Sequence, residues 1–156
     1  MVERRGLAGE RGYHREIRLE TTTGPDVFGT TDEGDGACLL FLHAGIADRR
    51  MWAGQIATYR SSFRVVAPDL RGFGESPVAT GPFAHHLDMS ALFDRCGVRR
   101  AVVVGNSYGA NVALDLAIAF PERVVALVLV STLAGMDQPS DVLNEVWRRS
   151  EAAFAE

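Results

Sequence analysis

Gly105-Asn106-Ser107-Tyr108-Gly109 is the segment that decides how this chain is expected to fold. It has the form G-x-S-x-G and stands directly after the apolar run 101–104 and directly before a stretch with helical spacing, 110–120. On a sharp turn from a strand to a helix, a serine hydroxyl is exposed at the edge of the sheet. The two glycines fit because a side chain at either position would collide with the neighbouring strand or helix. We therefore predict a nucleophile elbow with Ser107 as catalytic nucleophile; a Gly-rich loop with an ordinary N-cap serine is the alternative.

Three further apolar runs predict strands that are buried on both faces, as in a parallel sheet. They cover residues 38–42, 63–67 and 124–130, and predicted helices at about Pro82–Cys96 and at 110–120 alternate with them. This alternation is typical of an α/β fold with helices on both faces of a mostly parallel sheet. Gly24-Pro25 and Gly34-Asp35-Gly36 predict hairpin-like turns between the first strands, so that the expected sheet has about six strands.

Taken in order, these motifs make the chain similar to the α/β-hydrolase fold family, from about residue 14 to about residue 133. The matching segments are the turn His43-Ala44-Gly45, Met51-Trp52, the loop Asp69–Ser76, the elbow, and the connection Phe120–Val124. Within the family, the sequence most resembles the small esterases related to oxoadipate enol-lactonase. The resemblance implies hydrolysis of a small carboxylic ester or lactone through an acyl-enzyme on Ser107. C–C bond hydrolysis and perhydrolysis by the same fold stay open as alternatives.

The resemblance also implies how the oxyanion of the reaction is held. One donor is the backbone N–H of Tyr108, and the second is an N–H in the turn after the His43 strand. Counting back from Met51-Trp52 places that second donor at Gly45. A glycine after a strand is also explained by a need for positive φ, so a purely structural role for Gly45 remains an alternative.

Supporting roles follow from the same resemblance. They fall on Gly105 and Gly109 for the elbow, on His43 as a brace of the oxyanion loop, and on Asp69 and Arg71, which hold their own loop in place. Two other interpretations remain open. His43 lies near the nucleophile and is a candidate general base, and Asp69 closes a strand at the ligand-binding edge of the sheet and is a candidate catalytic acid.

The general base and acid of a complete triad are not expected in this chain. The family order is serine, then Asp or Glu, then His, and no histidine follows Ser107 before the last residue, Glu156. His85 and His86 are expected to be solvated at the entry of their helix, and His14 lies in an Arg-rich start. Asp137 and Asp141 are candidate acids with poor spacing. We therefore expect a partial sequence with weak activity.

The chain divides into three expected parts. Residues 1–12 are a flexible tail, 13–135 are the N-terminal part of the hydrolase core, and 136–156 begin a lid, with an amphipathic helix starting at Asp141–Trp147. The strand 124–130 is expected at the edge of the sheet, with both faces short of covering helices. Such an edge favours pairing with another chain, so self-association, or a non-catalytic remnant that binds a partner, is a further hypothesis.

The composition is that of one globular domain, with 47% hydrophobic residues, 23% charged residues and a net charge of −4. Nothing in it indicates nucleic-acid binding, and no apolar run is long enough for a membrane span. Cys38 and Cys96 have no C-x-x-C spacing, which favours reduced thiols in a cytoplasmic protein and argues against a metal site. We expect no cofactor. All 16 basic residues are arginine, as in a GC-rich bacterial genome.

Overall fold

The computed structural model describes residues 28–132, which form a five-stranded sheet with helices on both faces. The order of the strands across the sheet is β1-β3-β2-β4-β5. They cover β1 (Thr30–Glu33), β2 (Cys38–Leu42), β3 (Arg64–Pro68), β4 (Ala101–Asn106) and β5 (Val124–Val130). All neighbouring strands are parallel except β1 and β3, which are antiparallel. The predicted α/β-hydrolase architecture with a mostly parallel sheet is confirmed.

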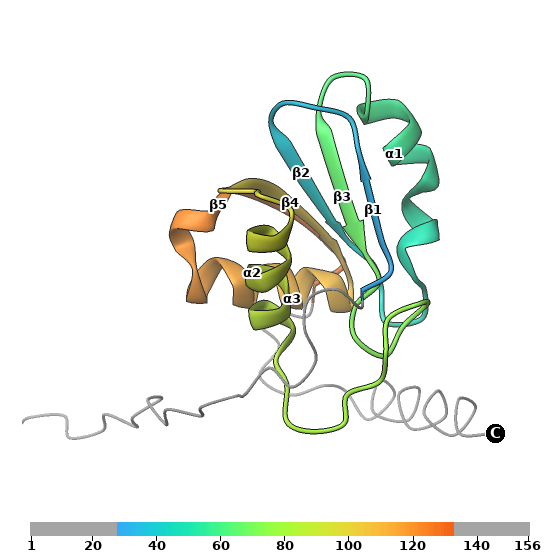
Figure 1. The fold of residues 1–156 in the computed structure, drawn as a ribbon, viewed down its shortest axis with the longest axis vertical. Coiled ribbons are helices and arrows are strands. Elements are labelled where there is room, and N and C mark those ends of the chain that lie inside the picture. Colours follow the sequence, from blue (N-terminus) through green and yellow to red (C-terminus); the bar gives the residue numbers. More distant parts are fainter. Residues whose placement is uncertain (1–27, 133–156) are drawn as a thin grey trace, which may run out of the picture.

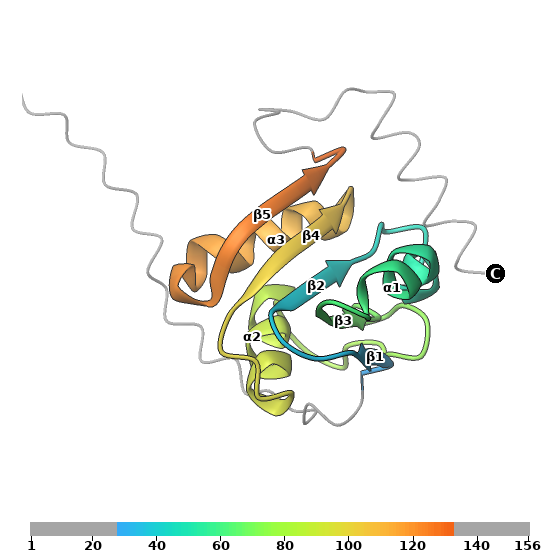
Figure 2. The ribbon, with the colours of Figure 1, turned by 90° about the horizontal axis from the view of Figure 1, so that it is seen from above.

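The apolar residues of the central strands alternate between the two faces of the sheet. On β2, Leu40 and Leu42 belong to one core cluster, whereas Phe41 belongs to another with Trp52 and Ile56. This alternation explains why the run contains no polar residue, since each strand face is covered by a helix. Figures 1 and 2 show the helices around the sheet. They are α1 (Ala53–Tyr59), which follows the short helix η2 (Arg49–Trp52), α2 (His85–Arg95), and α3 (Tyr108–Ala119), which precedes η3 (Pro121–Arg123).

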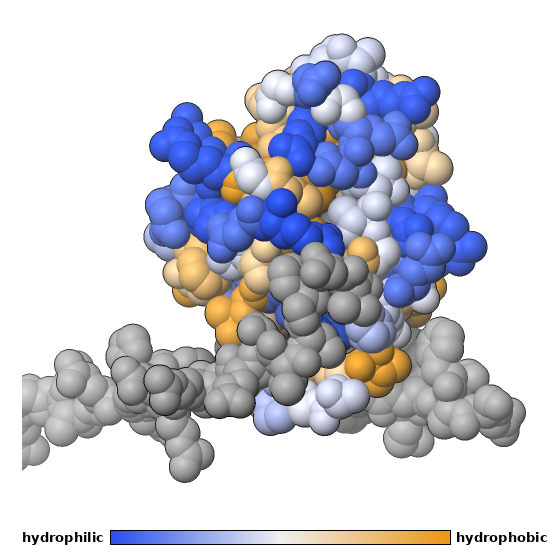
Figure 3. Space-filling view, viewed as in Figure 1, coloured by the Kyte–Doolittle hydropathy of each residue, from blue (hydrophilic) through white to orange (hydrophobic). Residues whose placement is uncertain are grey.

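Strand β5 forms one edge of the sheet, as predicted, and Figure 2 shows it beyond β4. The expectation that both of its faces lack a helix is wrong for one face, because Leu127 and Leu129 pack on the core cluster that includes α3. On the other face Val128 and Val130 are exposed, by 47% and 41%. Val125, where the register with β4 shifts, is exposed by 56%. In the space-filling view, apolar residues also surface on the side where α3 lies (Figure 3).

One expectation about the first strands differs from the structure. The turn at Gly34 and Gly36, both with positive φ, does not make a hairpin, because β3 lies between β1 and β2. Strand β1 pairs with β3 instead, with Thr30 opposite Pro68. The structure describes five of the about six expected strands, and residues before Gly24-Pro25 lie outside the described part of the chain. The tail at 1–12 and the lid helix at 136–156 lie outside them too.

Among residues 28–132, no helix has the length and apolarity to cross a bilayer. Cys38 and Cys96 are not joined in a disulfide. Burial raises the pKa of Cys38 to about 11, so its thiol stays protonated and unreactive at neutral pH.

Candidate active site

The predicted elbow lies between β4 and α3. Ser107 is the N-cap residue of α3, with φ 51° and ψ −111°, and its N–H donates to Val130 O over 2.8 Å. A residue other than glycine rarely adopts positive φ, and such a backbone conformation costs about 1–3 kcal/mol. Within residues 28–132, Ser131 is the other non-glycine residue with positive φ. The strained backbone at Ser107 is what a serine needs in order to leave the strand and stand clear of the helix.

Both elbow glycines are required by close backbone contacts. A Cβ atom on Gly105 would lie 2.4 Å from Gly109 O, and one on Gly109 would lie 2.3 Å from Leu42 O. The distances are too short for any side chain. Gly109 therefore lets the start of α3 touch the end of β2, and this contact brings the serine next to the turn that follows β2.

The turn after β2 places Gly45 beside the residue that follows the serine. A Cβ atom on Gly45 would lie 3.3 Å from the Cβ of Tyr108. The N–H of Ala44 already donates to the Met51 sulfur over 3.4 Å. In contrast, neither the N–H of Gly45 nor that of Tyr108 donates to an acceptor in the described part of the chain. Two neighbouring N–H groups are thus available at the start of α3, where the helix dipole favours negative charge.

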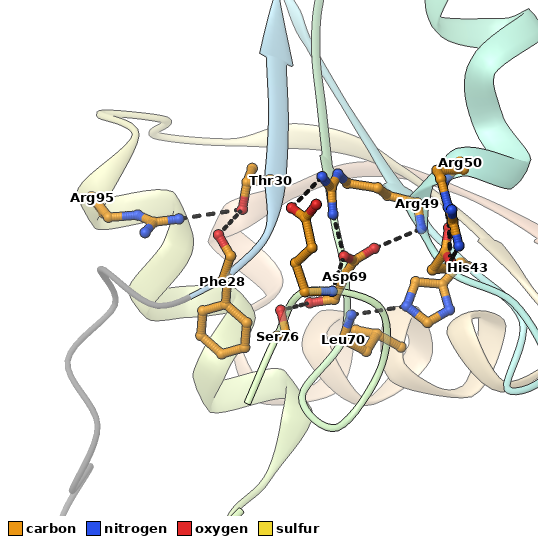
Figure 4. Close-up of polar contacts among 11 residues, drawn as sticks. Phe28, Thr30, His43, Arg49, Arg50, Asp69, Leu70, Ser76 and Arg95 are labelled. Atoms are coloured by element: carbon orange, nitrogen blue, oxygen red, sulfur yellow. Dashed lines mark hydrogen bonds and ion pairs between the residues drawn. The ribbon is translucent and has the colours of Figure 1, made fainter. Parts of the chain in front are cut away.

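His43 is completely buried and both of its ring nitrogens are engaged. Leu70 N–H donates to Nε2 over 2.8 Å, so the proton is on Nδ1, which donates to Ala44 O over 2.8 Å. Figure 4 shows the ring of His43 beside Leu70, in the loop that follows β3. Burial lowers the pKa of His43. With no free nitrogen, this residue links the turn at Gly45 to the loop after β3, which supports a bracing role rather than that of a base.

Asp69 is the centre of a polar network at the end of β3 (Figure 4). Its buried carboxylate accepts the N–H groups of Arg49 and Glu75, each over 2.8 Å, and pairs with the Arg49 guanidinium. The hydroxyl of Ser76 donates to Asp69 O over 2.7 Å. Because both of its carboxylate oxygens are buried and accept hydrogen bonds within the network, Asp69 is placed to hold its loop rather than to act as an acid or base.

Arg71 anchors the same loop to α2. Its guanidinium donates to both carboxylate oxygens of Asp88, over 2.8 and 2.6 Å, and this pair is buried. The rings of Phe28 and Phe83 lie 5.1 and 5.7 Å from its Cζ. Sequence reasoning missed Asp88. The available signal was a carboxylate among the buried positions of an amphipathic helix, because a charge there needs a partner.

The expectation that His85 is solvated is wrong. Its ring packs edge-on against Phe83 at 4.9 Å and Tyr108 at 5.4 Å, and its Nδ1 is buried without a hydrogen-bond partner. His86 packs against Phe120 at 6.4 Å. Within residues 28–132, no hydrogen bond joins a histidine to Ser107. His14, Asp137 and Asp141 lie outside the described residues.

We expect His85→Phe to make the stability of the chain less sensitive to acid. Burial lowers the pKa of His85 to about 4, whereas an unfolded histidine has a pKa near about 6.5. As the pH falls from 6.5 to 4, the unfolded chain binds a proton that the folded chain does not, and folding loses on the order of 2 kcal/mol. Urea unfolding at pH 7.5 and pH 5 measures this slope. With His86→Phe as the control, an equal slope in both variants would contradict the assignment.

Among the described residues, no three His, Cys, Asp or Glu side chains gather as they would around a metal ion. The site brings together a serine hydroxyl, two N–H groups without an acceptor among the described residues, and the N-terminus of helix α3. These groups match what acyl transfer to a serine requires.

Comparisons with known proteins agree with this architecture. A family model described as alpha/beta hydrolase fold matches residues 38–156. Epoxide hydrolase 2 of Siraitia grosvenorii is 36% identical over 104 residues, 63% of this chain and 33% of that protein. A 2-hydroxymuconate semialdehyde hydrolase of Pseudomonas sp. strain CF600 is 35% identical over 124 residues, 74% of this chain and 44% of that protein.

A solved structure, a thermophilic esterase from Thermogutta terrifontis, superposes with a TM-score of 0.70 at 34% identity. The match covers 78% of this chain and 46% of the esterase. The chain thus spans about a third to a half of the length of these relatives. The family model covers most of the chain, and the elbow and sheet order fit it: the chain belongs to the α/β-hydrolase fold family.

Proposed function

We propose that this chain carries the nucleophile and the oxyanion donors of a serine hydrolase that acts on a small carboxylic ester or lactone. The observation that carries the proposal is the backbone of Ser107, held at φ 51° on the turn between β4 and α3. The likeness to an esterase at 34% identity supports an ester as substrate. Gly45 and Tyr108 lie next to each other, and neither N–H donates to an acceptor among the described residues, which supports a role in acyl transfer.

In the proposed reaction, Ser107 Oγ attacks the carbonyl carbon of the ester. The electron pair of the C=O bond moves onto oxygen, and this oxyanion accepts hydrogen bonds from the N–H groups of Tyr108 and Gly45. Collapse of the intermediate expels the alcohol and leaves an acyl group on Ser107, which water then removes. A base takes the proton of Ser107 and returns it to the leaving alcohol. We expect this base outside the described residues, because His43 has both nitrogens engaged and no hydrogen bond joins a histidine to Ser107 within residues 28–132.

The test is acylation by 4-nitrophenyl acetate, followed by mass spectrometry to locate the acetyl group. We expect slow acylation at Ser107 and none in Ser107→Ala. The rate is expected to be far below that of a complete triad, because removing a triad base costs on the order of a millionfold. Ser131→Ala is the matched control, since Ser131 has φ 53° and directly follows the neighbouring strand β5. It is expected to acylate like the wild-type chain.

Two outcomes would contradict parts of this proposal. Acetylation elsewhere than Ser107 would remove the assigned nucleophile. Turnover near ordinary enzyme rates that Ser107→Ala abolishes would instead mean that His43, His85 or His86 acts as the base within this chain.

A different hydrolytic reaction is the second candidate, favoured by the likeness to a 2-hydroxymuconate semialdehyde hydrolase at 35% identity. C–C bond hydrolysis or perhydrolysis would use the same elbow, and a comparison of substrates with matched acyl groups separates these reactions from ester hydrolysis.

A non-catalytic binding role is the third candidate. It is favoured by β5, an edge strand whose seven residues are all apolar and whose outer valines are exposed. Under that role, the purified chain would form a defined oligomer and Ser107 would remain unmodified by the ester.

A further inference from the structure

Arg49 ties the turn that contains Gly45 to the loop that follows β3. Its backbone N–H donates to Asp69 Oδ1 over 2.8 Å, and its guanidinium pairs with Asp69 Oδ2. The same guanidinium donates to Glu75 Oε2 over 2.6 Å. Figure 4 shows the side chain of Arg49 reaching across to Asp69. Main chain and side chain of one residue thus bind the same carboxylate.

The next residue, Arg50, has the same chemistry but no such link. Its side chain is 84% exposed, and it pairs with Asp48 two positions away. The side chain of Arg49 is only 20% exposed, and that of Asp69 is fully buried. A buried carboxylate needs charged or N–H donors, so the fold depends on the contact between Arg49 and Asp69. The exposed side chain of Arg50 satisfies no such buried group.

The turn is therefore held at both ends by one loop. At its start, His43 accepts the N–H of Leu70, and at its end, Arg49 binds Asp69. Gly45 lies between these two anchors, next to Tyr108. Inside the turn, the N–H of Ala47 donates to Ala44 O over 3.1 Å. Removing the Arg49 side chain takes away the guanidinium contacts with Asp69 and Glu75 and leaves the backbone bond to Asp69, so the anchor at this end of the turn is weakened.

We propose that Arg49 is a positioning residue that fixes the Gly45 N–H relative to the Tyr108 N–H through its contacts with Asp69. This inference rests on the proposed function, in which both N–H groups bind the oxyanion. A donor that is misplaced by about 1 Å costs on the order of a hundredfold in rate, so loss of the anchor affects the chemistry more than substrate binding.

The first readout needs no chemistry. In Arg49→Met, amide hydrogen exchange at Ala47 is expected to become at least about tenfold faster, because that N–H closes the turn. Exchange at Val103, in the buried core of β4, reports global unfolding and is expected to change much less. Arg50→Met is the matched control and is expected to leave both amides unchanged. Equal exchange at Ala47 in the two variants would overturn the proposal.

The second readout is the rate at which 4-nitrophenyl acetate acylates Ser107. We expect this rate to fall about 10- to 100-fold in Arg49→Met and to stay within about twofold in Arg50→Met. The concentration of ester that gives half the maximal rate is expected to change little in both variants. An unchanged acylation rate in Arg49→Met would overturn the positioning role.

Arg49→Lys covers the case in which Arg49→Met does not fold. A lysine keeps a charge near Asp69 but cannot bridge Asp69 and Glu75 with a planar fork, so we expect part of each effect. Should wild-type Ser107 not react, the proposed function fails, and Ala47 exchange still decides whether Arg49 holds the turn. Wild-type exchange and acylation in Arg49→Lys, with no folded Arg49→Met, would count against the proposal.

Discussion

Gly109→Ala is expected to destabilise the chain by about 3 kcal/mol or more, enough to unfold many domains of this size. The added Cβ would lie 2.3 Å from Leu42 O and 2.6 Å from His43 O. Both are backbone atoms at the end of β2, and they cannot move away freely because Leu42 is in register with Gly105 on β4. Relief of the clash requires α3 to separate from the sheet, which uncovers the core between them.

Gly54→Ala is the matched control for this prediction. Gly54 lies in α1, and a Cβ atom there meets nothing within 4 Å. The same substitution is therefore expected to stabilise the chain by about 0.5–1 kcal/mol, because alanine favours a helix more than glycine does. Urea unfolding followed by far-ultraviolet circular dichroism measures both variants. A loss below about 1 kcal/mol in Gly109→Ala would mean that the elbow tolerates a side chain at this position.

The parts of the fold that were predictable are those in which the residues of one segment are enough to mark its structure, without knowledge of the segments it contacts. Strands β2 and β5 begin and end where the apolar runs do, because burial on both faces excludes polar residues along the whole strand. Strand β1, Thr30–Glu33, is short and polar, and its sequence says nothing about its neighbour. Its antiparallel pairing with β3 depends on the path of the chain, so the hairpin prediction failed.

The candidate site divides in the same way. The elbow was predictable because its pattern lies within five residues, and Gly105 is required by Gly109 O inside that pattern, although the atom that excludes a side chain at Gly109 is Leu42 O on β2. Arg49 was not, since its partner Asp69 is 20 residues away and Arg50 beside it has identical chemistry. Likewise, the position of His85 at the entry of its helix suggested a solvated ring, whereas the ring packs on Phe83 and on Tyr108 of another helix. Only the fold determines which of two adjacent arginines, or of two adjacent histidines, faces inward.

Removing one member of the Arg71 and Asp88 pair is the second large effect that we expect. The two side chains are 7% and 6% exposed, and the pair joins the loop after β3 to α2. Asp88→Leu leaves a guanidinium between Phe28 and Phe83 without its carboxylate, and Arg71→Met leaves Asp88 without its guanidinium. Each is expected to cost about 3–5 kcal/mol, because breaking a buried ion pair from one side is more costly than replacing both of its members.

The double variant Arg71→Met with Asp88→Leu tests that reason. Its free energy of unfolding is expected to fall by less than the sum of the two single decreases. A double-mutant cycle of urea unfolding is expected to give a coupling energy of about 2 kcal/mol or more. Arg60→Met is the control, because its ion pair with Glu33 is exposed by 57% and 41%, and pairs of this kind contribute about 0–1 kcal/mol. Should Asp88→Leu lose no more than Arg60→Met, the loop after β3 would be held by its apolar contacts. The site at Gly45 and Tyr108 would then not depend on this ion pair.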